Sequence, residues 1–417
     1  MFTRYLAAGA LCLAIVIGIL PGSVGSAAPR SAAYKLRLSW DLMPGAVTYH
    51  VLFFSDTETK TAPPVAQYRD ISAPGLELDM RALPEQALTG YWLAQGVDRE
   101  GRAVGESVLR PLRTAEMAPT APLILDDYKG MAYLPVYPVY AWVPVLNASS
   151  YEVEVWREPD TARGKAERVR HFYTYESVLY DEAGLRLVGH YWWRVRALDG
   201  EGRGYSDWSA PTPWQINAPT PVAALGDSIT HGGGAISTPP CRTLYDWETY
   251  ATIPVKNIGF SGDTAAAMAD RFEADVLPFK PRLLVVMGGV NDFRSGTPAA
   301  VTIRFLRQIA DKCRAYGITP VFVTATPINP QRMAGSFGME EAAANWQRNQ
   351  RQINDWIMAQ PYAVDVTGAL TDEHGDLRSD YTADGLHPDY EAKRYIGETI
   401  GRYVTTHFPT ITDKVGT

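Results

Sequence analysis

The sequence predicts a multidomain protein in which two all-β sandwiches precede one α/β domain with a parallel sheet. The chain has 417 residues, a length that corresponds to several domains of ordinary size. A unit of about one hundred residues occurs twice in its first half. After residue 217, short apolar strands alternate with long helical segments, a pattern that the first half lacks.

The chain begins with a segment that is typical of a secretory signal peptide. Arg4 supplies a positive charge, residues 5–20 form an apolar run, and small residues follow at 25–28. A transmembrane anchor is the alternative, but the run is shorter than the ~20 residues that span a bilayer. Cys12 has no small-residue cleavage pattern before it, which argues against a lipid-modified N-terminal cysteine. We therefore expect residues 1–28 to be a signal peptide and the mature protein to be exported to a periplasm, the cell surface or the medium.

Composition excludes several classes of partner. The chain is 46% hydrophobic and 20% charged, and its net charge is −7. It has no block of Lys and Arg, so we expect neither nucleic acid nor an anionic membrane surface as a partner. No later segment reaches membrane-spanning length, so we expect no stable membrane insertion. The oligomeric state stays open.

Cysteines indicate no metal centre. No Cys/His cluster has metal-ligand spacing, so we predict no structural zinc and no cofactor. Export leaves Cys241 and Cys313, which either form a disulfide or remain as two buried thiols. The second alternative is favoured, because spacing does not show that the two sulfurs meet.

The repeated unit is defined by aromatic residues and by a turn. In each copy a Trp precedes a Tyr by nine residues. A later Tyr-Trp pair leads to an Asp-x-x-Gly-Arg turn in both copies. The matching residues are Trp40 and Trp142, Tyr49 and Tyr151, Tyr91 and Tyr191, Trp92 and Trp192, and Gly101 and Gly202, at offsets of 100 to 102 residues. Alternating apolar residues between turn signals predict a β-sandwich in each copy.

These spacings resemble the fibronectin type III module, over residues 33–116 and 119–216. The resemblance implies spacing, docking or glycan contact rather than chemistry. The aromatic residues Tyr133, Tyr137, Tyr140 and Trp142 have two interpretations, a platform for sugars or ordinary core and edge packing, and packing is favoured.

Residues 219–408 predict the α/β domain. Residues 217–221 form a Pro-containing linker, and after it the predicted strands are 222–225, 255–258, 283–287, 319–324 and 363–366. The predicted helices 298–316 and 340–358 are long enough to cross over a sheet. Strand and helix alternation predicts a parallel sheet with helices on both faces. Ligands of such sheets bind beyond the carboxyl ends of the strands, where this domain carries its polar clusters.

Four motifs lie at these strand ends. They are Gly226-Asp227-Ser228, Gly262 within residues 257–263, Gly289-Val290-Asn291-Asp292, and Asp384-Gly385-Leu386-His387. Their identity and order resemble the SGNH or GDSL family of esterases and acylhydrolases, and Ile229 stands where that family often has Leu. The resemblance implies a three-layer, flavodoxin-like α/β hydrolase domain.

Three of these residues have the chemistry of a serine hydrolase. A serine hydroxyl becomes a nucleophile when an imidazole takes its proton, and a carboxylate must orient that imidazole. Among the seven histidines only His387 has an Asp three positions earlier, which is Asp384. We therefore expect Ser228 as nucleophile, His387 as base and Asp384 as the residue that orients it.

The oxyanion formed on attack needs preorganised donors. The resemblance implies three of them, which are the N–H of Ser228, the N–H of Gly262 and the side-chain amide of Asn291. Asp227 and Asp292 are expected to hold the loops through local hydrogen bonds rather than to act as bases.

Each of these residues also has a simpler interpretation. Ser228 could cap a helix, Gly262 and Asn291 could be turn residues, and His387 could lie in an exposed loop. All four would have to coincide in one α/β domain, which favours the hydrolase. His231 follows the serine motif, but no acid is spaced to orient it, so it is expected in the pocket wall or in solvent. The elbow motif G-x-S-x-G is absent from the chain.

The expected substrate is an acylated polysaccharide or another ester. Residues 232–242 and 326–337 should help to form the pocket wall, and they contain few large aliphatic side chains, which favours a short acyl group such as acetyl. We therefore expect an exported carbohydrate O-acetylesterase. The alternatives are a lipase or thioesterase of the same family, and a surface glycan-binding or adhesion protein whose hydrolase-like domain is inert.

Overall fold

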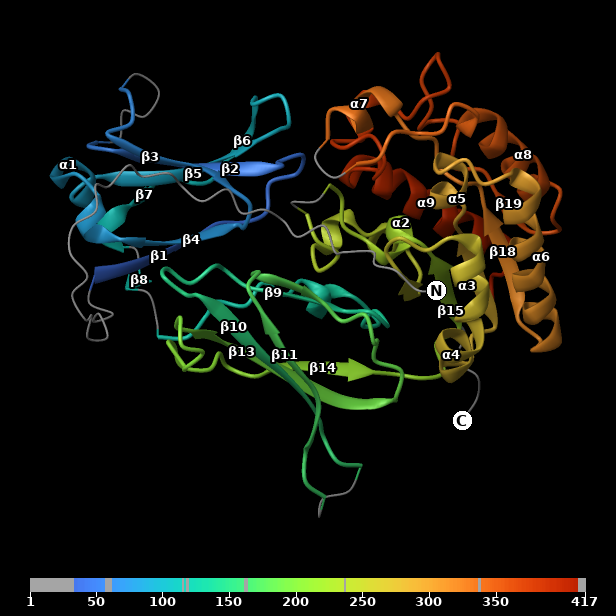
Figure 1. Ribbon diagram of the computed structural model, residues 1–417, viewed down its shortest axis with the longest axis horizontal. Coiled ribbons are helices and arrows are strands. Elements are labelled where there is room, and N and C mark those ends of the chain that lie inside the picture. Colours follow the sequence, from blue (N-terminus) through green and yellow to red (C-terminus); the bar gives the residue numbers. More distant parts are fainter. Residues whose placement is uncertain are drawn as a thin grey trace.

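The computed structural model describes residues 34–56, 62–114, 116–117, 120–160, 164–235, 238–336 and 339–411. The proposed signal peptide, residues 1–28, lies outside this part of the chain. Two regions of antiparallel sheet, which we call module 1 and module 2, precede an α/β domain (Figure 1).

Module 1 consists of two antiparallel sheets. One has the order β4-β1-β8 and the other has the order β3-β2-β5-β6, with β7 paired to β5. The strands are β1 (Lys35–Ser39), β2 (Thr48–Phe54), β3 (Ala66–Ile71), β4 (Gly75–Asp79), β5 (Tyr91–Val97), β6 (Ala103–Glu106), β7 (Arg110–Pro111) and β8 (Glu116–Met117). Leu36 and Leu38 of the first sheet share one buried cluster with Val51, Phe53 and Trp92 of the second. The core of module 1 therefore lies between its two sheets.

Module 2 has a similar arrangement. A sheet of order β11-β10-β13-β14 accompanies the pair β12-β9. The strands are β9 (Val139–Ala141), β10 (Ser150–Arg157), β11 (Glu167–Thr174), β12 (Val178–Tyr180), β13 (Gly189–Leu198) and β14 (Thr212–Ile216). Tyr137, Tyr140 and Trp142 are buried, so these rings pack in the core instead of forming an exposed platform.

The α/β domain contains five parallel strands in the order β16-β15-β17-β18-β19. They are β15 (Val222–Gly226), β16 (Lys256–Gly259), β17 (Leu283–Met287), β18 (Thr319–Val323) and β19 (Ala363–Val364). This is the order of doubly wound, flavodoxin-like sheets, and it confirms the predicted parallel sheet. The first three strands are buried along their whole length, as expected for a sheet that is covered on both faces.

Helices cover both faces of this sheet (Figure 1). The elements α3 (Ala265–Asp270), α6 (Ala299–Ala315) and α8 (Trp346–Met358) pack against one another on one face, and α9 (Tyr390–His407) covers the other. The shorter helices are α2 (Ser228–His231), α4 (Phe272–Val276), α5 (Val290–Arg294) and α7 (Pro330–Ala334). Helix α8 begins later than the predicted 340–358, and before its start the Ala343 N–H donates to the carbonyl of Arg294 at the end of α5 instead of to a residue of its own segment.

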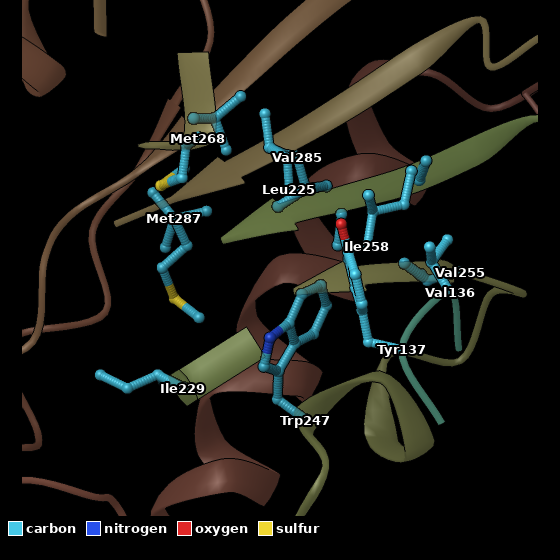
Figure 2. Packing of buried hydrophobic residues seen from close by; sticks show 14 of the residues in the cluster. Val136, Tyr137, Leu225, Ile229, Trp247, Val255, Ile258, Met268, Val285 and Met287 are labelled. Atoms are coloured by element: carbon cyan, nitrogen blue, oxygen red, sulfur yellow. The ribbon is translucent and has the colours of Figure 1, made fainter. Parts of the chain in front are cut away.

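Module 2 and the α/β domain share one hydrophobic core. Val136 and Tyr137 pack with Val255 and Ile258 (Figure 2). The Val136 N–H donates to the carbonyl of Asn257 at 3.0 Å, so the segment before β9 hydrogen-bonds to the edge strand β16. This contact fixes module 2 beside the edge of the sheet.

Module 1 contacts both of the other parts through polar groups. Lys35 Nζ donates to the carbonyl of Leu146 and Glu77 Oε2 accepts from the Leu146 N–H, both in module 2. In the α/β domain, Tyr245 Oη accepts from the Gly45 N–H at 3.2 Å. Module 1 is thus held against its neighbours at several points.

Both cysteines of the described residues are buried and unbonded. Cys241 and Cys313 therefore take the second of the two alternatives that the sequence left open. Over the described ranges, no helix is both long and apolar enough to cross a membrane.

Candidate active site

Ser228, His387 and Asp384 form a hydrogen-bonded chain. Ser228 lies two residues beyond the end of β15 and is the first residue of α2, where the Asp227 carboxylate between them caps the helix. Its Oγ lies 3.0 Å from His387 Nε2, and His387 Nδ1 lies 2.7 Å from Asp384 Oδ2. The structure therefore brings together the three residues that the motifs suggested, from segments 159 residues apart.

Asp384 is held in its charged form. It is 4% exposed, and burial opposes ionisation, but the His387 imidazole and the N–H groups of Leu386 and His387 lower its pKa to about 2. A carboxylate only accepts hydrogen bonds, so His387 carries its proton on Nδ1. His387 Nε2 is then free to accept from the Ser228 hydroxyl, which is the arrangement that a general base requires.

A cavity lies beside the Ser228 hydroxyl, and three residues that carry N–H donors line it. Ser228, Gly262 and Asn291 all line it, and within the described residues no protein acceptor takes the backbone N–H of Ser228 or Gly262. Gly262 has a φ of +88° with open space where a Cβ would stand, so glycine is needed there for its backbone conformation. The N–H groups at this edge remain available to a ligand.

The orientation of the Asn291 amide is fixed from both ends. Its Nδ2 donates to the carbonyl of Asp263 at 2.9 Å, and its Oδ1 accepts from Arg294 Nε at 3.2 Å. An amide nitrogen has two hydrogens, so one remains for a group in the cavity. Arg294 thereby keeps the amide from presenting its oxygen to that group.

Asp227 and Asp292 make local hydrogen bonds. Asp227 Oδ1 accepts from the Ile229 N–H at 2.9 Å, and burial raises its pKa to about 7. Asp292 Oδ2 accepts from the Ala265 N–H at 2.9 Å and so ties α5 to the start of α3, and burial raises its pKa as well. Neither carboxylate contacts His387 by a hydrogen bond within the described part of the chain, so neither orients it.

Arg271 connects two of the loops, and the motifs gave no sign of it. Its guanidinium pairs with Asp263 at 2.6 Å and with Asp275 at 2.9 Å, and it donates to the carbonyls of Ile258 and Gly226 at 2.8 and 2.9 Å. Gly226 precedes the serine motif, and Asp263 follows Gly262. Arg271 therefore ties the serine loop to the loop that supplies a second N–H donor.

His231 is part of the wall of this cavity. Its Nε2 lies 2.7 Å from the carbonyl of Tyr137 and its Nδ1 lies 2.8 Å from Ser261 Oγ. Complete burial lowers its pKa to about 4, so the ring is neutral at pH 7, donates to Tyr137 and accepts from Ser261. No carboxylate of the described residues orients it by a hydrogen bond, in contrast to His387.

The cavity beside Ser228 has a volume of about 1980 Å³. It exceeds the ~300–1,000 Å³ of an ordinary small-molecule pocket. All three parts of the chain contribute to its wall, including Tyr49, Tyr68 and Arg99 of module 1, Tyr137, Trp142 and Tyr180 of module 2, and Phe260, Arg294 and Met339 of the α/β domain. The two polar loops that the sequence singled out thus supply only part of the wall, since the modules pack against the strand ends.

One group of side chains has the spacing of metal ligands. Ligand atoms of Glu152, Glu154 and His171 on module 2 lie within 4.8 Å of one another. Arg196 pairs with Glu152, and Arg168 and Arg194 pair with Glu154, so cationic side chains already neutralise both carboxylates. The group does not fit a bound cation.

The comparison with protein families concerns the α/β domain. Residues 224–394 match the model of the GDSL-like lipase/acylhydrolase family. The parallel sheet and this match define a GDSL-like acylhydrolase domain, a class whose members are esterases and lipases. The chain is also 28% identical over 149 residues to an uncharacterized lipoprotein, YqeF, of Bacillus subtilis (strain 168). That alignment covers 31% of this chain, and the chain spans about half (51%) of the length of that relative.

Two solved structures that are similar to this chain are a lipase/acylhydrolase and an acetylxylan esterase. A lipase/acylhydrolase from Enterococcus faecalis has 22% identity and a TM-score of 0.36, over 45% of this chain and 95% of that one. Axe2, an acetylxylan esterase from Geobacillus stearothermophilus, has 19% identity and a TM-score of 0.35, again over 45% and 95%.

Proposed function

We propose that this protein is an exported serine esterase that removes short acyl groups, acetyl above all, from a carbohydrate. The observation that carries the proposal is the chain from Ser228 Oγ through His387 to Asp384, with distances of 3.0 and 2.7 Å, in a GDSL-like acylhydrolase domain. Acyl transfer needs an ionised carboxylate on His387 Nδ1 and an accepting Nε2 beside the serine hydroxyl, and this arrangement supplies both.

In the first step, Ser228 Oγ attacks the ester carbonyl while His387 Nε2 takes the hydroxyl proton. The tetrahedral intermediate collapses, the alcohol leaves with the proton from His387, and the acyl group stays on Ser228. Water then attacks this acyl-enzyme, His387 takes a proton from the water, and the carboxylic acid leaves as Ser228 recovers its proton. Asp384 stays ionised throughout and stabilises the imidazolium that forms twice.

The oxyanion of both intermediates is stabilised by the N–H groups of Ser228 and Gly262 and by the amide of Asn291. These donors are held in place before substrate arrives, by the backbone conformation at Gly262 and by the bonds of Asn291 to Asp263 and Arg294. Fixed donors need no reorganisation during the reaction, which is why they lower the barrier. Asp227 and Asp292 support the two loops.

The size of the cavity supports a bulky alcohol portion of the substrate. A wall that includes rings from both modules, such as Tyr68 and Tyr180, offers apolar faces and hydroxyl groups to a large molecule. A short acyl group on a sugar polymer fits this shape, with the polymer along the modules and the acyl group at Ser228. Module 1 and module 2 are, in this proposal, fibronectin type III-like sandwiches, and residues 1–28 direct export.

The test is hydrolysis of p-nitrophenyl acetate, butyrate and octanoate by the purified protein, beside the Ser228→Ala variant. Turnover that is fastest with acetate and absent in Ser228→Ala supports the proposal, and release of acetate from acetylated xylan and other acetylated glycans then identifies the polymer. Faster turnover of octanoate than of acetate would instead indicate a lipase or thioesterase of the same family. No turnover of any ester or acetylated glycan, with polysaccharide binding that survives Ser228→Ala, would instead identify a glycan-binding protein.

A further inference from the structure

The turn between β5 and β6 of module 1 reaches the loop that carries Asp384. Arg99 lies in this turn, and its guanidinium donates to two carbonyls of the α/β domain, those of Ala383 at 2.6 Å and Arg332 at 3.1 Å. Ala383 immediately precedes Asp384, and Arg332 lies in α7. Strand β6 lies on the side of module 1 that faces α7 (Figure 1). One side chain therefore links module 1, α7 and the Asp384 loop.

The duplicated module shows that Arg99 is not needed to build this turn. The Asp98 N–H donates to the carbonyl of Arg102 at 2.9 Å, and the Asp199 N–H donates to that of Arg203 at 2.9 Å. Each aspartate also accepts from the backbone and side chain of its arginine. The two turns thus have the same hydrogen bonds, but Gly200 stands in module 2 where module 1 has Arg99.

The neighbouring glutamates differ in the same way. Each glutamate pairs with the arginine of its own turn, Glu100 with Arg102 and Glu201 with Arg203, but Glu100 also pairs with Arg332 of α7 at 2.8 Å. On the α/β side, a Cβ at Gly335 would lie 2.7 Å from the Arg99 Nη2 and would otherwise meet only ordinary contacts. Residue 335 therefore leaves room for the Arg99 guanidinium.

We propose that Arg99 is a positioning residue for the reaction, through which module 1 holds the Asp384–His387 loop in place. This inference rests on the proposed function of Ser228. A guanidinium that donates to two carbonyls makes charge-assisted bonds of fixed geometry. The bonds join the residue before Asp384 to α7, so their loss lets Asp384 move relative to Ser228. A displacement of about 1 Å can cost roughly 100-fold in rate.

The experiment compares Arg99→Ala with Arg102→Ala on p-nitrophenyl acetate. Arg102 is in the same turn, but among the described residues its ion pairs are those with Asp98 and Glu100 of that turn, so it is the matched control. We expect Arg99→Ala to lower kcat roughly 10- to 100-fold with KM almost unchanged and the melting temperature close to that of the wild type, and Arg102→Ala to leave kcat nearly unchanged.

Gly335→Ala tests the same contact from the other side. Since its new methyl group meets only the end of the Arg99 side chain, we expect it to lower kcat in the wild type and to have no effect in Arg99→Ala. Both carbonyls accept from one nitrogen, Nη1, and a lysine Nζ also has several hydrogens to donate, so Arg99→Lys should recover part of the kcat that Arg99→Ala loses. Equal kcat in Arg99→Ala and the wild type, or effects of Arg99→Ala and Gly335→Ala that multiply, would overturn the proposal.

A spectroscopic measurement separates this inference from the proposed function. The proton on His387 Nδ1, shared with Asp384, should give a low-field NMR signal that His387→Gln removes. We expect Arg99→Ala to shift or broaden this signal and Arg102→Ala to leave it in place. If the wild type hydrolyses no ester while the signal still responds to Arg99→Ala, the proposed function fails and the positioning stands; an unchanged signal in Arg99→Ala refutes the positioning.

Discussion

Asp384→Asn should nearly abolish esterase activity without disturbing the shape of the site. Asp384 Oδ1 accepts the N–H groups of Leu386 at 2.9 Å and of His387 at 2.8 Å. An asparagine keeps its carbonyl oxygen on these two donors, which turns its NH2 group toward His387 Nδ1. That nitrogen must then accept, so the ring proton moves to Nε2, and His387 no longer takes the proton of Ser228.

The expected loss in kcat is about 10⁴-fold, which corresponds to roughly 5 kcal/mol of transition-state stabilisation. The loss comes from the wrong tautomer, so KM for p-nitrophenyl acetate should change little. The assay is steady-state hydrolysis of that ester, with a crystal structure of the variant to establish the orientation of the amide.

Asp389→Asn is the matched control. Asp389 is five residues further along and caps α9 through bonds to the N–H groups of Glu391 and Ala392, which an asparagine oxygen also makes. It removes the same charge from the same loop without changing the partner of His387. A kcat for Asp384→Asn within about tenfold of the wild type, with the amide oriented as described, would refute the role of the carboxylate in fixing the tautomer.

Three further outcomes follow from the same contacts. Asn291→Ala should lower kcat by about 10²–10³-fold with little change in KM, because it removes one oxyanion donor; an unchanged kcat in steady-state assays would exclude the amide from that role. Burial holds the pKa of His231 near 4, below its ordinary 6.5. Between these two pH values the unfolded chain binds a proton that the folded chain does not, so the free energy of unfolding falls by up to about 3 kcal/mol as pH drops from 6.5 to 4. Urea unfolding of His231→Gln should show a smaller loss over that window than the wild type, and an equal loss would contradict the buried neutral ring. Burial raises the thiol pKa of Cys241 and Cys313 to about 12, so neither should react with iodoacetamide at pH 8 until the protein is unfolded, as peptide mass spectrometry would show.

The α/β domain was predictable because its local patterns agree with its tertiary structure. The apolar run 283–287 is β17 to the residue, and the predicted helix 298–316 differs from α6 by one residue at each end. Strand β19 is shorter than the predicted 363–366, and beyond its end the Val366 N–H donates to the Thr324 side chain; α8 starts later than predicted, and before its start the Ala343 N–H donates to the Arg294 carbonyl. Such bonds depend on which segments become neighbours, and periodicity does not report that.

The residues of the candidate site also differ in how far the sequence predicts them. The sequence predicts Ser228, His387 and Asp384, because the serine motif follows a predicted strand and the Asp-x-x-His spacing pairs the imidazole with its carboxylate. Arg271 was not predicted, since an arginine between two short helices gives no sign that it will bridge two loops. Arg99 left a weak trace, because it replaces Gly200 of the second copy in a turn that is otherwise the same, and a comparison of the two copies would have singled it out.

The two modules contact the α/β domain by different physical means. Module 2 shares its apolar core, through Val136 and Tyr137, and the Tyr137 carbonyl accepts from His231 in the cavity wall. Module 1 keeps a separate core and reaches the α/β domain through polar groups such as Arg99 and Glu100. Burial of apolar surface is strong and does not depend on direction, whereas a few directed hydrogen bonds fix geometry at modest energy. Module 2 is therefore suited to stabilise the fold around Ser228, and module 1 is suited to set the position of the Asp384 loop.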